Sequence, residues 1–348
     1  MFTVGGRLMD RFGSKKGLAA SVGVWSVANS LHGIITNFYQ LVFFRFLLGV
    51  GEGGCFPGAA KAVYEWFSEK NRALANGIAI GGSAIGAVIA PPLTIFISSG
   101  LGWRWSFVIP GLIGILWVAG WLLLPSPGRE GGADNEKLTK KKVVPFSTIL
   151  KNRQAQTFII IRFLLDPVLY FIMFWTPKYL HEQRNVAFED IGKLFWVPFL
   201  ALGLANVIGG FFSDKLVKRG VSINRARKTV MGVAAAITLV APFIAFVSSA
   251  QVAVALMAAI MFAHGFWITN YITSISDIFG GIGTSTVVGL SGTAGAISGL
   301  LINPLIGIVV QSYSYTPIWV ACGLMYPVAF VLFLVFVPKI QSLVLQKA

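Results

Sequence analysis

Gly5 to Lys16 reads GGRLMDRFGSKK, and Gly209 to Arg219 reads GGFFSDKLVKR. In both stretches a glycine pair is followed, after three residues, by an aspartate, and the next residue is basic. Further basic residues close each stretch. One copy lies near the start of the chain and the other lies in its second half. A loop that recurs in this way predicts a chain built from two structurally similar halves.

The rest of the chain is strongly apolar. Of its 348 residues, 55% are hydrophobic and only 12% are charged, and the mean hydropathy is +0.75. A soluble domain carries about 25% charged residues, so the composition indicates a polytopic membrane protein. The apolar runs are continuous and do not alternate, which favours an all-α protein over a membrane β-barrel. Cys55 and Cys322 lie within such runs and predict neither a disulfide nor a metal site.

Ten apolar segments are long enough to cross a bilayer, for which a helix needs about 20 residues. They are 17–36, 38–66, 73–98, 104–124, 155–180, 190–212, 228–248, 251–276, 285–311 and 316–337. The repeated loop occupies the same kind of position in both halves. We therefore expect two parallel-repeat helical bundles, related by an axis along the membrane normal.

One long polar stretch separates the fourth apolar segment from the fifth. Its proline, glycine and mixed charges are typical of a linker between two membrane bundles. The sequence thus predicts an N-terminal bundle at 1–124, a cytoplasmic linker at 125–153 and a C-terminal bundle at 154–348.

The charge of the chain is strongly basic, with 28 Lys and Arg residues against 13 Asp and Glu residues and a formal net charge of +15. Most of the basic residues fall in one alternate set of loops, which includes both repeated stretches and the linker. Loops rich in Lys and Arg stay in the cytoplasm, so this bias orients a multi-pass protein in the inner (plasma) membrane. The charge is therefore a topology signal and implies no nucleic-acid partner. We expect a monomer whose macromolecular partner is the lipid bilayer.

The first repeated stretch resembles the signature loop of the major facilitator superfamily, GxxxDRxGxKK, at Gly6, Asp10, Arg11, Gly13, Lys15 and Lys16. Within that superfamily the chain resembles the anion:cation symporters of hexuronates, galactonate, glucarate and sialic acid. The resemblance is carried by RFLLGVGEGGCFPG at Arg45 to Gly58 and by RFLLDPVLYFIMFWTPKYL at Arg162 to Leu180. It implies twelve helices in two bundles and no cofactor or metal.

The resemblance also implies a gate at the cytoplasmic side. We assign to this gate the six signature residues together with Arg72 and Asp214. Asp10 is expected to accept hydrogen bonds there and to counter the charges of Arg72 and Arg11, which would hold the cytoplasmic side shut.

The start of the chain departs from the family pattern. The family's first helix and most of its second have no counterpart, since the chain begins where the second helix should end. In relatives the first helix supplies substrate and coupling residues, so we expect an incomplete pathway in the chain as written. A misplaced start codon, with Met1 an internal methionine, is one explanation.

Two charged residues lie inside the apolar segment 38–66. Arg45 and Glu52 fall on one helical face, roughly 10.5 Å apart along its axis. A charge near the bilayer centre costs about 2.5–3.5 kcal/mol and needs a partner or an aqueous cavity. One interpretation is a buried ion pair that fixes helix packing. We favour another, in which Arg45 binds a substrate carboxylate bidentately and Glu52, at the family position linked to proton coupling, carries the proton.

Arg162 and Asp166 form a second pair of charges, four residues apart and predicted to lie at the start of a helix. Arg162 is a candidate for binding the substrate. The alternative is an ion pair at the membrane interface that merely anchors the helix, since such pairs are common and weak.

The helix predicted around 251–276 is unusually polar for a bilayer segment. Trp267, Asn270, Ser274 and Asp277 follow a three-to-four spacing, which could line a cavity with one ring and several hydrogen-bonding groups. We assign Trp267, Asn270 and Ser274 to substrate binding. Packing between helices is the alternative for the Ser and Thr residues. His264 is typical of a satisfied core histidine and receives no role.

The predicted function is secondary active transport of an organic anion, as proton-coupled symport of a hexuronate or related sugar acid by alternating access. An enzyme is not expected, because no nucleophile, phosphate loop or metal-ligating set occurs in a suitable context. Segment 73–98 lacks the GPxxGG pattern of the superfamily's antiporters. Two alternatives remain open, an antiporter or exporter of the same fold and a non-functional membrane fragment.

Overall fold

The computed structural model describes residues 1–125 and 144–343. Within these ranges every regular element is a helix, which confirms the predicted all-α fold class. The helices before the gap are α1 (Phe2–Phe12), α2 (Ser14–Leu31), η1 (His32–Ile34), α3 (Phe38–Glu52), α4 (Cys55–Trp66), α5 (Arg72–Leu101) and α6 (Trp105–Leu123). Those after it are α8 (Phe146–Lys151), α9 (Arg153–Arg184), α10 (Phe188–Lys218), α11 (Ile223–Thr238), η2 (Ala241–Ala245), α12 (Ala250–Ser312) and α13 (Thr316–Phe336).

All ten predicted apolar segments coincide with these helices. By length and composition, eight helical stretches of the described chain could cross a membrane. The difference from ten has two sources. α12 covers two predicted segments in one run of 63 residues, which is broken at Gly280 (φ 58°, ψ −156°). α2 covers the first predicted segment but is not one of the eight. The predicted segment 38–66 divides between α3 and α4 at Gly53 and Gly54.

Side-chain caps set the start of several helices. Asn152 accepts hydrogen bonds from the backbone N–H groups of Gln154 (2.9 Å) and Ala155 (3.0 Å), and so begins α9 at Arg153. Arg162 and Asp166 consequently lie more than two turns inside α9. The prediction that this pair marks the start of a helix is therefore wrong, because the cap lies further back along the chain.

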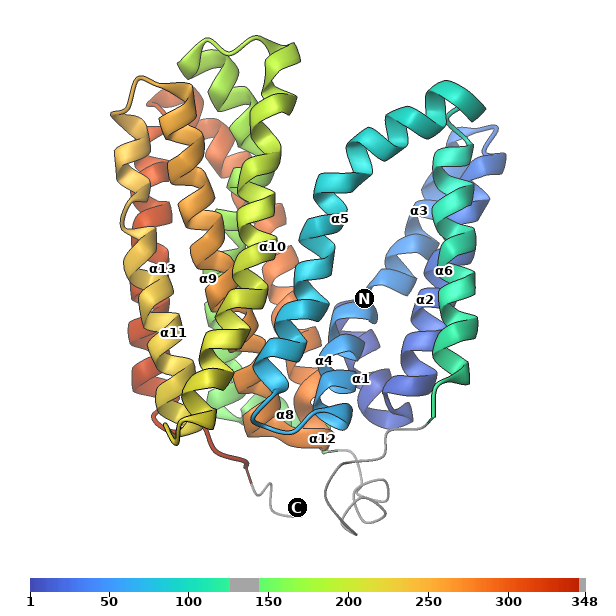
Figure 1. Ribbon diagram of the computed structural model, residues 1–348, viewed down its shortest axis with the longest axis vertical. Helices are drawn as coiled ribbons and strands as arrows, with labels where there is room; N and C mark the ends of the chain where they lie inside the picture. The colour runs from blue at the N-terminus through green and yellow to red at the C-terminus, as the bar shows by residue number, and fades with distance from the viewer. Residues whose placement is uncertain (126–143, 344–348) are drawn as a thin grey trace.

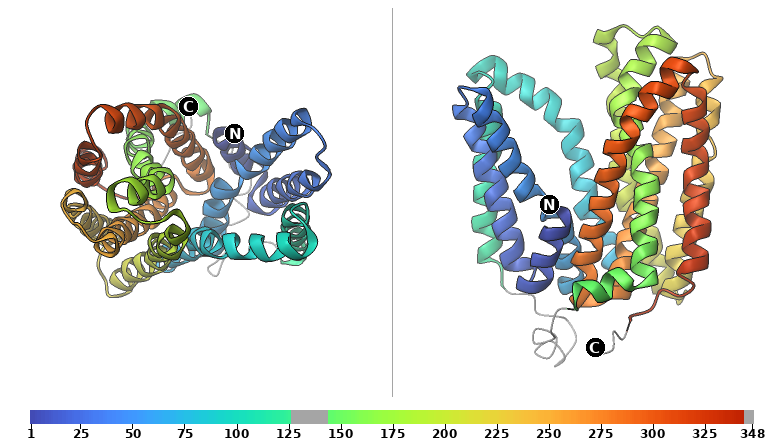
Figure 2. Two further views of the ribbon diagram at one scale, coloured as in Figure 1. Left: turned by 90° about the horizontal axis from the view of Figure 1, so that it is seen from above. Right: turned by 180° about the vertical axis from the view of Figure 1, so that it is seen from behind.

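The helices form two bundles that stand side by side (Figure 1). α1 to α6 make up one bundle and α9 to α13 the other. In the side views of Figures 1 and 2 the two bundles are apart at the upper end and come together toward the lower end. The bundles meet where α5 packs on α10 and where α1 and α4 pack on α12. Most of the predicted linker, 126–143, lies outside the described residues, and the boundaries predicted for the bundles stay a prediction.

The two bundles are packed to different extents. The main hydrophobic core lies in the second bundle, where Phe158, Phe171 and Trp319 are fully buried. By contrast, only 6% of the apolar window in α6 is buried inside the protein. An apolar helix surface of this kind suits contact with lipid.

Candidate functional site

A cavity of about 210 Å³ lies between the bundles and is called here the central cavity. α1, α4 and α5 supply one side of its wall, and α9, α10 and α12 supply the other. Its polar lining residues are Ser83, Arg162, Asp166, Tyr170, Asn206 and His264. The remaining lining residues are mostly apolar. A largely apolar wall with a few converging polar groups is typical of a small-molecule site.

Arg162 and Asp166 form an ion pair in this wall. Nε of Arg162 donates a hydrogen bond to Oδ1 of Asp166 at 2.6 Å. The Asp166 side chain is 3% exposed, whereas that of Arg162 is 21% exposed. The pair therefore faces the space between the bundles and is not a solvated anchor at the end of a helix. The role of Arg162 in substrate binding stays a prediction.

His264 also lines the central cavity, together with Ile268 and Ile272. These three positions are one helical turn apart and define the face of α12 that is turned toward the cavity. Nδ1 of His264 lies 2.5 Å from the hydroxyl of Tyr326 on α13, which fixes the ring. His264 is buried and hydrogen-bonded, as the sequence predicted for a satisfied core histidine. Its place beside the cavity could not be predicted, because a single histidine in an apolar helix carries no sign of which face meets a cavity.

Trp267, Asn270 and Ser274 lie on other faces of α12 and are not part of the cavity lining. The Trp267 ring packs edge-on against Tyr326, with the ring centroids 5.6 Å apart. Asn270 donates from Nδ2 to the carbonyl of Phe266 at 3.0 Å, and the hydroxyl of Ser274 donates to the carbonyl of Asn270 at 2.7 Å. The contact of Ser274 corresponds to the packing alternative given for the Ser and Thr residues. Nε1 of Trp267 and Oδ1 of Asn270 are buried without a hydrogen-bond partner among the described residues, and the assignment of these two residues to substrate binding stays a prediction.

Arg45 and Glu52 are both exposed on α3. The Arg45 guanidinium lies 5.8 Å from the centroid of the Phe107 ring. Within the described residues no ion pair joins Arg45 to Glu52, so the structure does not contain the buried pair that was the alternative interpretation. Neither residue belongs to the lining of the central cavity.

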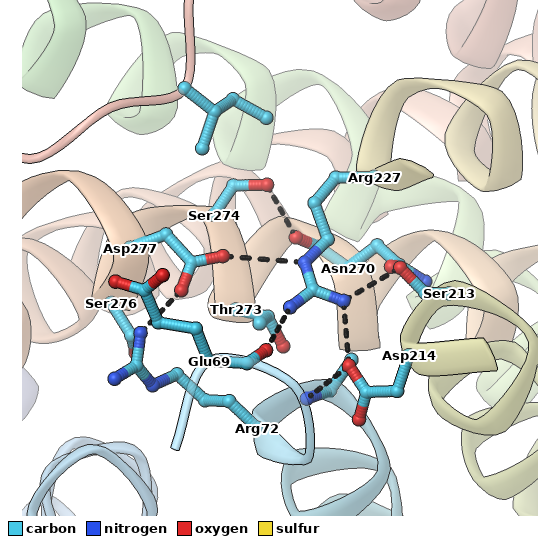
Figure 3. Close-up of polar contacts among 12 residues, drawn as sticks. Glu69, Arg72, Ser213, Asp214, Arg227, Asn270, Thr273, Ser274, Ser276 and Asp277 are labelled. Carbon is cyan, nitrogen blue, oxygen red and sulfur yellow. Dashed lines mark hydrogen bonds and ion pairs between the residues drawn. The ribbon is translucent and has the colours of Figure 1, made fainter. Parts of the chain in front are cut away.

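A group of four charged residues closes one end of the molecule and is called here the ion-pair cluster (Figure 3). It consists of Arg72, Asp214, Arg227 and Asp277. Arg72 Nη1 lies 2.5 Å from Asp277 Oδ1, and Arg227 bridges Asp277 (Nε–Oδ2, 3.3 Å) and Asp214 (Nη1–Oδ1, 2.9 Å). Arg227 also donates to the carbonyl of Glu69 at 3.2 Å. Because Glu69 and Arg72 belong to the first bundle, the cluster ties the two bundles together.

The aspartates of the two repeated stretches have equivalent roles, since each binds backbone N–H groups of a helix in the other bundle. Asp214, in the second bundle, accepts from the backbone N–H groups of Ala73 (3.3 Å) and Leu74 (2.7 Å) at the start of α5. Asp10, in the first bundle, accepts from those of Ser285 (3.3 Å) and Thr286 (2.7 Å), just after the break in α12. Each aspartate therefore caps a helix of the other bundle.

The expectation that Asp10 counters Arg72 and Arg11 is wrong. Its charged partner is Lys61, whose Nζ lies 3.1 Å from Asp10 Oδ1. Arg72 is taken by Asp277 instead, and the Arg11 guanidinium lies 5.4 Å from the Phe12 ring centroid. α1 packs on α12 and α4, which places Asp10 beside Lys61 and away from the start of α5.

The other signature residues serve the packing and ends of helices. A Cβ on Gly6 would overlap the carbonyl oxygen of Ser285, so this glycine allows α1 to approach α12. Gly13 has a φ of 79° and separates α1 from α2. Lys15 donates to the carbonyl of Leu124 at 2.6 Å, and Lys16 is exposed.

Two buried cations of this region were not singled out from the sequence. Lys61 is 3% exposed and Arg227 is 0% exposed. A lysine inside the apolar segment 38–66 was a usable signal for Lys61. Arg227 was hidden among the many basic residues of a predicted loop, whereas the structure places it in α11. Composition alone does not show which of several neighbouring basic residues is buried.

The family model described as the Major Facilitator Superfamily matches residues 1–303. The chain belongs to this superfamily. It is therefore a multi-pass transport protein of the inner membrane and not an enzyme, as the sequence predicted. The two-bundle architecture is that of the superfamily.

The chain is similar to transporters of known name. It is 27% identical over 338 residues to the D-galactonate transporter of Escherichia coli O6:H1, covering 90% of this chain and 77% of the relative. It is also 27% identical over 335 residues to the hexuronate transporter of Escherichia coli K12, covering 92% and 77%. Among solved structures, the human organic anion transporter MFSD10 (TETRAN) superposes with a TM-score of 0.74 at 14% identity, covering 95% of this chain and 79% of that one.

Proposed function

We propose that the protein transports a sugar acid, such as a hexuronate or an aldonate, together with protons. The observation that carries this proposal is the position of Arg162 in the wall of the central cavity. A guanidinium remains charged at every physiological pH and matches the geometry of a carboxylate, so it selects acids over neutral sugars. The printed names of the galactonate and hexuronate transporters support the same class of substrate.

Two residues of α3 complete the proposed chemistry. Arg45 supplies a second cation for the anion, and Glu52 carries a coupled proton. Both side chains are exposed and unpaired with each other among the described residues, which supports a role toward a ligand more than a role in packing.

The transport cycle is alternating access, in which the two bundles rock about the central cavity. The ion-pair cluster and the two reciprocal aspartate caps hold the bundles together at one end. Lys70 and Arg219, near this end, belong to the loops that the positive-inside rule assigns to the cytoplasm. Opening toward the cytoplasm would then require these contacts to separate, and release of the anion would follow.

The test is uptake of labelled D-glucuronate into proteoliposomes under an inward proton gradient. The wild type should accumulate glucuronate above the external concentration, and galactonate, but not glucose, should compete. Arg162→Gln should reduce uptake roughly 10- to 150-fold, since a hydrogen bond to a charged group is worth about 1.5–3 kcal/mol.

Lys193→Gln is the matched control, because Lys193 is a cation with a 77% exposed side chain and is not part of the cavity lining. It should transport like the wild type. Competition by glucose as strong as that by galactonate, or full uptake by Arg162→Gln, would contradict the proposal.

A further inference from the structure

Asp166 occupies part of the surface of Arg162 that a substrate carboxylate would need. Its Oδ1 accepts from Nε at 2.6 Å. Within the described residues this is the only hydrogen bond that the Arg162 guanidinium donates, so both Nη groups remain for a ligand that enters the central cavity. A carboxylate that binds bidentately to the edge formed by Nε and its neighbouring Nη would compete directly with Asp166 for Nε.

The far side of the Asp166 carboxylate is closed by α12. A Cβ on Gly295 would overlap Oδ2 of Asp166, so the glycine makes room for the carboxylate between α9 and α12. The carboxylate is therefore held in a built site, and it cannot withdraw into solvent when its partner is taken.

Arg162 is the only cation that faces Asp166 among the described residues. The other titratable groups around the pair are Tyr170 on α9, His264 and Tyr271 on α12, and Tyr326 on α13. Tyr271 donates its hydroxyl to the carbonyl of Phe158 at 2.5 Å, and His264 is bonded to Tyr326. No second positive charge is available to Asp166 from these neighbours.

The charges at this site decide what happens when an anion binds. Arg162 and Asp166 together are neutral, and an added carboxylate would leave one guanidinium facing two buried carboxylates. Like charges in one site disfavour double ionisation, and a buried charge without a partner is costly. Uptake of one proton removes both penalties.

We propose that Asp166 is an internal stand-in for the substrate carboxylate and a second proton carrier. An anion takes Arg162 from Asp166, and Asp166 takes up a proton; one carboxylate and one proton enter the site together, and no covalent bond to carbon changes. When the anion leaves, the proton leaves and the ion pair re-forms. This inference rests on the proposed function and adds a coupled proton in the second bundle, independent of Glu52 in the first.

The test counts protons taken up on binding, with a pH indicator and weakly buffered purified protein at pH 7.5. The probes are D-glucuronate and, as a minimal carboxylate, acetate at high concentration. Asp166→Asn should take up about one proton fewer per bound anion than the wild type. The affinity for the anion should also depend less on pH. For each unit by which the pH rises, the affinity of Asp166→Asn should fall about tenfold less than that of the wild type, which is the slope expected for one linked proton.

Two further variants keep the test decisive. Glu52→Gln alters an exposed side chain, so it should fold, and it should still take up the Asp166 proton. Asp190→Asn, which removes a 52% exposed carboxylate paired with Lys193, is the matched control and should behave like the wild type. Unchanged proton uptake by Asp166→Asn, or none by Glu52→Gln, would overturn the inference.

The same experiment separates this inference from the proposed function. If glucuronate binds but Asp166→Asn takes up as many protons as the wild type, the carboxylate exchange is refuted and sugar-acid transport is not. Acetate binding with that proton, but no glucuronate binding, would support the exchange and refute the sugar acid.

Discussion

At the scale of single residues, three arginines inside the helical part of the chain differ through their surroundings. Arg227 is fully buried and is neutralised by Asp214 and Asp277. Arg162 is paired on one side and open to a cavity on the other. Arg45 is exposed, and its guanidinium lies over the Phe107 ring. Removal of a buried, paired charge costs about 3–5 kcal/mol, whereas an exposed one contributes little to stability.

Arg45 and Glu52 should therefore be separable in function without loss of the fold. Arg45→Ala should abolish glucuronate binding, and Glu52→Gln should still bind and exchange glucuronate but lose uphill accumulation, because it cannot titrate. Each change should alter the free energy of unfolding by about 0.5 kcal/mol or less. Counterflow and gradient-driven uptake, measured side by side in proteoliposomes, test this. Full proton-driven uptake by Glu52→Gln would refute its coupling role.

At the scale of elements, the repeated stretches act across the molecule and not within their own bundle. Asp10 caps the second part of α12, and Asp214 caps α5. A carboxylate at a helix N-terminus satisfies free N–H groups and interacts favourably with the helix dipole. Both hydrogen-bonded caps can form only while the two bundles are in contact at this end of the molecule. The caps therefore stabilise the form in which this end is closed.

Loss of either cap should loosen this end. Asp10→Ala and Asp214→Ala should each cost about 3–5 kcal/mol, because each also takes a carboxylate away from a buried cation, Lys61 or Arg227. Asp10→Asn should cost less, because the amide oxygen still accepts the backbone hydrogen bonds. We expect a larger population with the cytoplasmic end open and a slower transport cycle, with glucuronate affinity nearly unchanged. Distances between spin labels across that end measure the population. Asp190→Ala, exposed in the first turn of α10, is the control. An equal loss of affinity would instead make Asp10 a binding residue.

At the scale of the whole molecule, two glycines allow the bundles to touch. A Cβ on Gly6 would overlap the carbonyl oxygen of Ser285, and one on Gly210 would overlap that of Ala73. These positions match in the two repeated stretches, so each bundle supplies one close approach. The bundles are therefore held together at this end by backbone contact as well as by charge.

A methyl group at either glycine should separate the bundles. Gly6→Ala and Gly210→Ala should each destabilise the closed form by about 1–3 kcal/mol, as expected for overpacking. Gly86→Ala, on α5 with open space around its Cβ position, should be neutral or slightly stabilising. Spin-label distances and thermal unfolding in detergent report both effects. Stability equal to that of Gly86→Ala would show that the contact does not hold the bundles together.

The sequence alone determined the large features of this protein. Apolar segments of membrane length, the bias of basic loops and the repeat at Gly5 and Gly209 specified an all-α membrane protein of two similar bundles, because these features depend on local composition and spacing. The same is true of the arginine at 162, since a charge within an apolar run is visible without a structure. Only the tertiary structure decided which faces meet. Helical periodicity placed Trp267 and Ser274 on one face, but it did not show that His264 lies beside the cavity. It also did not show that Asp10 pairs with Lys61 or that Arg227 is buried. Those outcomes depend on how α12 is rotated against helices far away in the chain, and no local pattern encodes that rotation.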